Sequence, residues 1–108
     1  MTQTIPAPIA DYFAGSNAKD VAATAASFAQ SASVFDEGKT HTGRPAIEAW
    51  IADAFAKYGA HAEVSAVEPK GGAYRVAALV SGNFPGSPAT LHYDFTLADN
   101  QITALSIG

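Results

Sequence analysis

Two spacings of apolar residues divide the chain into a helical first half and a stranded second half. Up to Gly59, apolar side chains recur every three or four positions, which places them on one face of an α-helix. From Ala62 onward they alternate with polar residues, a pattern typical of β-strands with one buried face. Helices that precede a run of strands predict an α+β fold, with the helices packed on one face of a sheet.

Three helices are expected in the first half. Pro8 suits the first turn of one helix, Asp20 is a plausible N-cap for a second, and Gly43-Arg44-Pro45 opens the longest, which closes at Gly59 as a C-cap. The apolar stripes of the three helices are, in order, Ile9, Tyr12 and Phe13; Val21, Ala25 and Phe28; and Ile47, Trp50, Ile51, Ala54 and Tyr58.

Strands are predicted on both sides of the third helix. A strand from Ala32 to Phe35 and a short extended piece from Thr40 to Thr42 flank the acidic turn that begins at Asp36. After the helix, turn-forming residues such as Pro69 to Gly72 separate four further segments, which predicts an antiparallel meander. These four segments are Ala62 to Glu68, Tyr74 to Gly82, Ala89 to Leu97 and Ile102 to Ile107.

Composition narrows the class of protein. At 108 residues the chain suits a single domain, residues 1–108, and 48% apolar with 15% charged residues describes a folded globular protein. The six lysines and arginines are scattered and the net charge is −4, so we expect no nucleic-acid partner. No apolar run is long enough for a membrane span, and Met1 to Ala10 lack the basic start of a signal peptide, so we expect a cytoplasmic protein. The absence of cysteine excludes disulfides and zinc–thiolate sites.

Several segments together resemble a known superfamily. Phe28 to Asp36 (FAQSASVFD) and Thr42 to Trp50 (TGRPAIEAW) look like its helix, strand, acidic turn and following helix, and Ser81 to Gly86, Leu91 to Asp99 and Ile102 to Ile107 resemble its final strands. The chain thus resembles the ketosteroid isomerase-like, or nuclear transport factor 2-like, superfamily in its SnoaL-like branch. The resemblance implies a cone-shaped, curved antiparallel or mixed sheet that packs with three helices around one apolar pocket. It is specific for fold and weak for activity, because this scaffold hosts several enzymes and also binding modules.

The resemblance implies roles for Asp36 and Tyr12. Asp36 falls where the family places a carboxylate that transfers a proton on carbon next to a ketone, and Tyr12, 24 residues earlier, falls where it places a phenol that binds the enolate oxygen. Each residue also has an ordinary explanation. Asp36 can simply begin a turn, and Tyr12 can be an amphipathic core aromatic.

A second oxyanion donor is expected on the strand around Tyr93. Counted without gaps, Asp94 resembles the family's protonated Asp. Strand alternation instead places Leu91, Tyr93 and Phe95 on one apolar face and Asp94 on the other, which favours Tyr93 in the pocket. Both residues remain candidates, and this departure puts steroid isomerisation itself in doubt.

The remaining candidates concern binding. We expect Phe28, Val34, Trp50, Phe55 and Phe95 to form the substrate-binding wall, within a core that also holds Ile51 and Leu105. His41, His61 and His92 lie apart with no metal-ligand spacing, so no metal or cofactor is expected. His41 could reach the pocket rim, although a surface position is favoured.

Two classes of function follow from these residues. The first is a cofactor-free isomerase, cyclase or dehydratase that acts on a small apolar carbonyl compound, with Asp36 as acid and base. The second is a non-catalytic ligand-binding or dimerisation module. A homodimer is expected in either case, because an outer sheet face with residues such as Ala77, Leu79 or Ile107 would otherwise expose an apolar patch.

Overall fold

The computed structural model describes residues 5–108 and contains three helices and one six-stranded sheet. Residues 1–4, which belong to the segment Met1 to Ala10 discussed above, lie outside the described residues. The helices are α1 (Ala7–Asn17), α2 (Val21–Ala26) and α3 (Arg44–Tyr58). The strands are β1 (Phe28–Asp36), β2 (Lys39–Thr42), β3 (His61–Lys70), β4 (Ala73–Ser81), β5 (Ala89–Ala98) and β6 (Gln101–Ile107).

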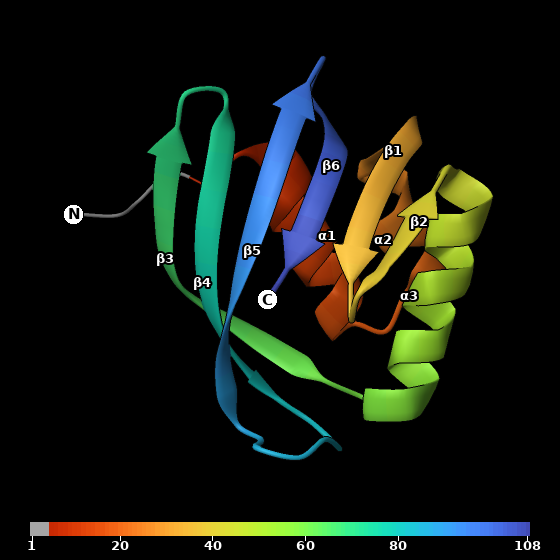
Figure 1. Cartoon of the computed structure of the whole chain (residues 1–108), viewed down its shortest axis with the longest axis vertical. Helices are drawn as coiled ribbons and strands as arrows, with labels where there is room; N and C mark the ends of the chain where they lie inside the picture. The colour runs from red at the N-terminus through yellow and green to blue at the C-terminus, as the bar shows by residue number, and fades with distance from the viewer. Residues whose placement is uncertain (1–4) are drawn as a thin grey trace.

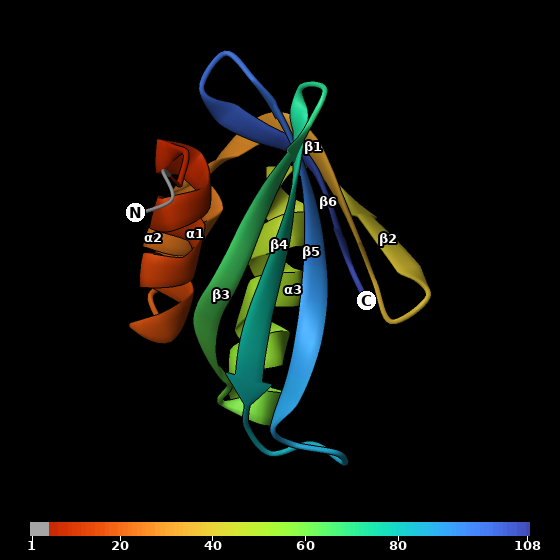
Figure 2. The same ribbon diagram turned by 90° about the vertical axis from the view of Figure 1, so that its left-hand side faces the viewer.

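The sheet is mixed and open, with strand order β2-β1-β6-β5-β4-β3. β3 to β6 form the expected antiparallel meander, and β1 joins it by a parallel pairing with β6. Figure 1 shows α1 and α2 behind the sheet and α3 beside the β1–β2 hairpin. In the turned view of Figure 2, α1 and α2 lie to one side of β3, β4 and β5, and α3 is seen behind these strands. The α+β fold and its curved mixed sheet are therefore as predicted.

The helix boundaries follow the expected local signals. Asp20 caps α2 by accepting a 3.0 Å hydrogen bond from the backbone N–H of Ala23. Gly59 ends α3 in the left-handed conformation at φ 54°, which glycine adopts without a steric penalty. None of the helices among residues 5–108 has the length and apolar character that a membrane crossing requires.

Two strand boundaries differ from the prediction by more than one residue. Phe28, expected on the second helix, begins β1, because it pairs in register with Ile102 of β6 and is fully buried there. β3 continues through Pro69, which was expected in a turn. β3 is an edge strand of the sheet, where the missing N–H of proline interrupts no ladder.

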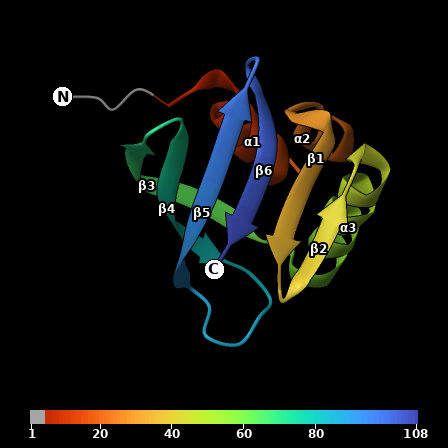
Figure 3. The same cartoon turned by 45° about the horizontal axis from the view of Figure 1, so that its top comes forward.

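The core lies between the helices and the inner face of the sheet. Aromatic rings from α1 and β5 form its centre, with Tyr12 and Phe13 in edge contacts with Tyr93 and Phe95. These four side chains are at least 94% buried. The view in Figure 3 shows α3 lying apart from α1, on the side of the β1–β2 hairpin, and the cavity described next lies between these parts of the fold.

Candidate active site

A cavity of about 550 Å³ is lined by residues from all three helices, β1, β4, β5, β6 and the β4–β5 loop. Its walls are mainly aromatic and aliphatic. Its lining residues of most interest are Tyr12, Asp36, Glu37, Trp50, Phe55, Tyr58, Phe84 and Tyr93. Among residues 5–108, the lining includes the two carboxylate side chains of Asp36 and Glu37 and no lysine, arginine or histidine, and so its charge disfavours anionic ligands.

Asp36 faces the cavity because of the alternation along β1. Ala32 and Val34 point inward and are at most 1% exposed, so Asp36, two residues further on, points the same way at the end of the strand. Its carboxylate is half-buried and accepts a 3.1 Å hydrogen bond at Oδ2 from the indole Nε1 of Trp50. The Asp36 carboxylate is thus held at a defined position in the cavity wall.

The surroundings of Asp36 act on its pKa in opposite directions. Burial, as the largest cause, raises the pKa of the Asp36 carboxyl above its ordinary value, and the negative charge of Glu37 adds to this. The Trp50 hydrogen bond, a backbone hydrogen bond from Glu37 and the proximity of His41 lower it. The net rise moves the carboxyl toward the range in which a general base works at neutral pH.

Two phenols share the cavity with this carboxylate. Tyr12 comes from α1 and Tyr93 from β5, and their ring centroids lie 6.2 Å apart. Neither hydroxyl has a hydrogen-bond partner among the described residues. Burial, followed by the proximity of Tyr93 and Asp36, raises the pKa of the Tyr12 phenol well above its ordinary value. Burial and the nearby Asp36 raise the pKa of Tyr93 to about 12. Both phenols are therefore protonated donors at neutral pH.

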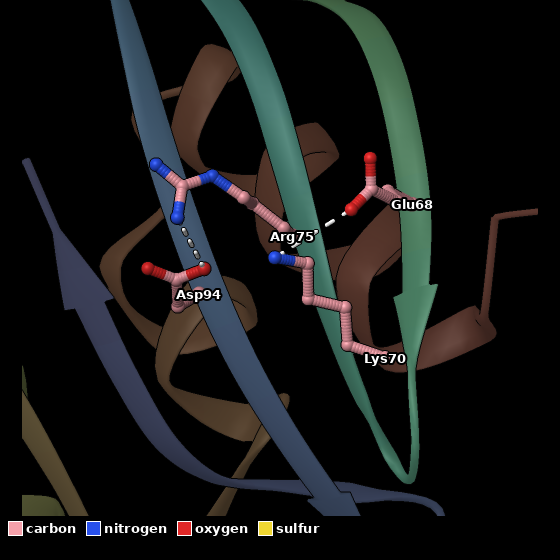
Figure 4. Close-up of polar contacts among 4 residues, drawn as sticks. All are labelled: Glu68, Lys70, Arg75 and Asp94. Carbon is pink, nitrogen blue, oxygen red and sulfur yellow. Dashed lines mark ion pairs between the residues drawn. The ribbon is translucent and has the colours of Figure 1, made fainter.

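Asp94 lies on the opposite face of the sheet. β5 alternates so that Tyr93 and Phe95 are buried inside while Asp94 is exposed. The Asp94 carboxylate pairs with the Arg75 guanidinium at 3.7 Å, on the face turned away from the helices, where Lys70 and Glu68 form a second pair (Figure 4). The sequence-based suggestion that Asp94 completes an oxyanion site is therefore wrong in its placement, and Tyr93 occupies the cavity.

The predicted binding wall divides into two groups. Trp50 and Phe55 line the cavity from α3 and are partly buried. Phe28, Val34 and Phe95 do not line it. They are 0% exposed and belong to the core, where the Tyr12 ring of α1 contacts Phe28 and Phe95 edge-on. Their assignment to the wall is corrected accordingly.

A second pair of residues links α3 with the β1–β2 turn. The Tyr58 hydroxyl donates a hydrogen bond to a carboxylate oxygen of Glu37, and the Tyr58 ring contacts Phe84 of the β4–β5 loop edge-on at 6.0 Å between centroids. Sequence analysis gave neither Glu37 nor Phe84 a role. Of Glu37, Tyr58 and Phe84, only Tyr58 was expected to face inward, because it belongs to the apolar stripe of the third helix.

A smaller hollow of about 440 Å³ adjoins the cavity, on the other side of the Trp50–Asp36 and Tyr58–Glu37 hydrogen bonds. It shares Asp36, Glu37, Trp50, Ala54 and Tyr58 with the cavity and adds polar residues from β2 and α3. His41 lines this hollow, half-buried, with its ring 6.0 Å from the Trp50 indole. It therefore lies closer to the site than the favoured surface position predicted. No group of acidic residues and histidines suited to a metal ion occurs within residues 5–108.

Comparisons with known proteins agree with this geometry. No protein-family model and no curated protein sequence matches the chain. Among solved structures, a candidate polyketide cyclase from Sinorhizobium meliloti is 38% identical, with a TM-score of 0.93, over 96% of this chain and 95% of its own. A ketosteroid isomerase-like protein from Catenulispora acidiphila, solved with trimethylamine, has a TM-score of 0.85 at 21% identity, over 97% of this chain and 86% of its own.

A third structure, the epoxide hydrolase/cyclase-like enzyme SalBIII of pyran ring formation in salinomycin, has a TM-score of 0.77 at 21% identity, over 93% of this chain and 85% of its own. At that identity it shares the fold alone, as does the Catenulispora protein. The Sinorhizobium protein is similar over almost the whole length of both chains, at an identity that indicates common descent. The chain therefore belongs to the nuclear transport factor 2-like superfamily, in its SnoaL-like, ketosteroid isomerase-like branch.

Proposed function

We propose that this protein is a cofactor-free enzyme that transfers a proton on a small, neutral, apolar carbonyl compound. The observation that carries the proposal is that Asp36, Tyr12 and Tyr93 line one mainly apolar cavity. A half-buried carboxylate with a raised pKa and two phenols that have no hydrogen-bond partner within the described part of the chain are the groups that enolisation requires.

The proposed step is balanced within the site. The Asp36 carboxylate takes a proton from the carbon next to the carbonyl, and the electrons of that C–H bond form the C=C bond of an enolate. The negative charge moves to the carbonyl oxygen, which accepts hydrogen bonds from Tyr12 and Tyr93. Protonated Asp36 then returns the proton to the same carbon or to another one, so no external oxidant or reductant is needed.

Exchange of a ketone's α-hydrogens tests this step. We expect the wild-type protein to accelerate the exchange of 2-tetralone α-hydrogens with D₂O, followed by NMR. Asp36→Asn keeps the side-chain shape and removes the proton acceptor, so it should reduce exchange about 10²- to 10⁴-fold, the usual contribution of a general base. Binding of 2-naphthol, a planar phenol that resembles the enolate, should persist in this variant.

Tyr12→Phe is the matched variant for the oxyanion donor. It should weaken 2-naphthol binding, because the missing hydroxyl is the group that would hydrogen-bond the phenol oxygen, while the aromatic packing is kept. Wild-type exchange no faster than that of a solution with free acetate, or unchanged exchange in Asp36→Asn, would argue for a binding module instead.

A second candidate function is the binding of a small ammonium ligand without catalysis. The cavity combines the carboxylates of Asp36 and Glu37 with the aromatic faces of Trp50, Tyr58 and Phe84, the combination that binds alkylammonium groups through charge and cation–π attraction. The similar fold of the trimethylamine complex supports this alternative. Calorimetry should then show that tetramethylammonium binds. Neopentyl alcohol, which is neutral and has a similar branched shape, should not bind.

A further inference from the structure

We propose that Trp50 is the positioning residue of this site: its indole N–H fixes the carboxylate of Asp36 in the orientation that faces the cavity. The sequence pattern suggested only an apolar wall position for this side chain. The inference rests on the proposed function for its catalytic consequence, whereas the orientation is a property of the free protein.

The hydrogen bond joins two elements that meet only in the folded chain. Trp50 lies in the second turn of α3, 14 residues after Asp36, and its Nε1 reaches Oδ2 of the carboxylate at 3.1 Å. A carboxylate has about four acceptor sites. The indole and the backbone N–H of Glu37 occupy part of this capacity, so acceptor sites remain for a substrate proton.

The Trp50 indole also contacts the His41 ring of β2. His41 projects from β2 on the same face as Asp36, because it pairs with Val34 and strand alternation places both on the inner side. Its ring lies 6.0 Å from the indole at an interplanar angle of 31°. The Trp50 ring is therefore confined between the hairpin and the cavity, which limits rotation of the donor away from Asp36.

Trp50 lies between the main cavity and the smaller hollow, and this position supports the same role. Trp50 and Asp36 both line the main cavity and the smaller hollow, so their hydrogen bond forms part of the wall between them. Without this bond, the carboxylate could turn into the smaller, more polar hollow. The Trp50 bond keeps it on the substrate side.

The single tryptophan of the chain makes the test specific. A ¹⁵N-labelled protein gives one indole N–H signal, which must come from Trp50. We expect the chemical shift of this signal to change with pH along the same titration curve as the ¹³C signal of the Asp36 carboxyl. In Asp36→Asn this pH-dependent change should disappear. Other titratable groups face the carboxylate, so the curve is repeated in His41→Gln. These groups are Glu37, Lys39 and His41 of the hairpin, Asp53 and Lys57 of α3, and Tyr12 and Tyr93.

Two variants remove the N–H donor and keep an aromatic ring at position 50. The first variant is the ordinary substitution Trp50→Phe. Replacement of all tryptophan by benzothienylalanine, which has sulfur in place of the N–H, changes only position 50 and preserves its shape. In both, the pKa of Asp36 should rise, because the hydrogen bond that lowers it is lost while burial remains. An indole signal that does not follow the carboxyl titration, or an unchanged Asp36 pKa in the benzothienyl protein, would overturn the proposal.

The catalytic consequence is measured with 2-tetralone exchange. Loss of the donor should lower kcat about 10- to 100-fold with little change in KM, because a misplaced base slows the step without changing how the substrate packs. If wild-type protein catalyses no exchange, the proposed function fails while the orientation result stands on its own. If wild-type protein is active and the benzothienyl protein retains the wild-type kcat, the positioning role is wrong and the proposed function survives.

Discussion

Asp36 is a half-buried carboxylate in a mainly apolar cavity, and its charged form opposes folding. The pKa of Asp36 is raised in the folded protein, chiefly by burial, so between the unfolded and folded values the native state binds more protons than the unfolded state. The contribution of this residue to stability is therefore fully present below the unfolded value of about 3.9 and is lost as the pH rises through the folded pKa.

We accordingly predict that Asp36→Asn is more stable than wild type at pH 7 and that the difference shrinks as the pH falls through the raised folded pKa of Asp36 toward its unfolded value of about 3.9. Urea unfolding of both proteins between pH 3 and pH 8 measures this difference. Exposed Asp11→Asn, on the outer side of α1, is the matched control and should show no comparable pH-dependent gain. A wild-type advantage that grows with pH would contradict the prediction, since it would mean that the fold favours the charged form of Asp36.

At the scale of elements, the part of the cavity wall that α1 and α2 form depends on the close approach of these two helices. Gly15 of α1 has no side chain, and a Cβ at this position would lie 2.7 Å from the Thr24 hydroxyl and 2.8 Å from the Thr24 backbone nitrogen. Ser16 and Thr24, next to this contact, line the cavity. The two helices therefore set the position of this part of the wall.

Gly15→Ala should destabilise the protein although alanine is the better helix former. Overpacking against backbone costs about 1–3 kcal/mol, whereas replacing a mid-helix glycine with alanine gains about 1 kcal/mol. Thermal unfolding should show a lower Tm, and 2-naphthol affinity should fall as α2 is displaced. Ala14→Gly, at an exposed neighbouring position, isolates the helix-propensity effect and should leave phenol binding intact. A Gly15→Ala protein as stable as wild type would show that α2 can shift freely.

At the scale of the whole molecule, the outer face of the sheet is open. Phe35 and Leu79 are the large apolar side chains exposed there, at 47% and 45%, and the half-buried Ala77 lies on the same face. Ile107, which sequence analysis expected on this face, lines the cavity instead, because it pairs with Tyr93 on the inner side. The open face thus retains two of the three residues expected to drive association.

We propose that two copies associate through this face as a homodimer, since burial of Phe35 and Leu79 against a symmetry-related sheet removes apolar surface from water. Light scattering at micromolar concentration should give about twice the 11.1 kDa chain mass. Phe35→Glu should shift the mass toward the monomer, and Glu48→Gln on an exposed part of α3 should not. A wild-type monomer under these conditions contradicts the proposal.

Local patterns determined much of this molecule from sequence. The cap at Asp20, the helix stop at Gly59 and the inward position of Tyr93 each follow from a few neighbouring residues, because helix caps and strand alternation are local properties of the backbone. The position of Asp36 after the first strand was likewise visible, since its inward direction follows from Val34 and Ala32, two and four residues before it.

The tertiary structure decided the features that depend on contacts between distant elements. Phe28 became a strand residue because β6 pairs with it, a contact that joins residues 28 and 102. Whether Phe95 or Phe55 lines the cavity depended on where α1, α2 and α3 cover the sheet. The hydrogen bond from Trp50 to Asp36 requires α3 to cross the hairpin at one position, and helix packing of this kind is set by the fit of many side chains together rather than by the periodicity of any one segment.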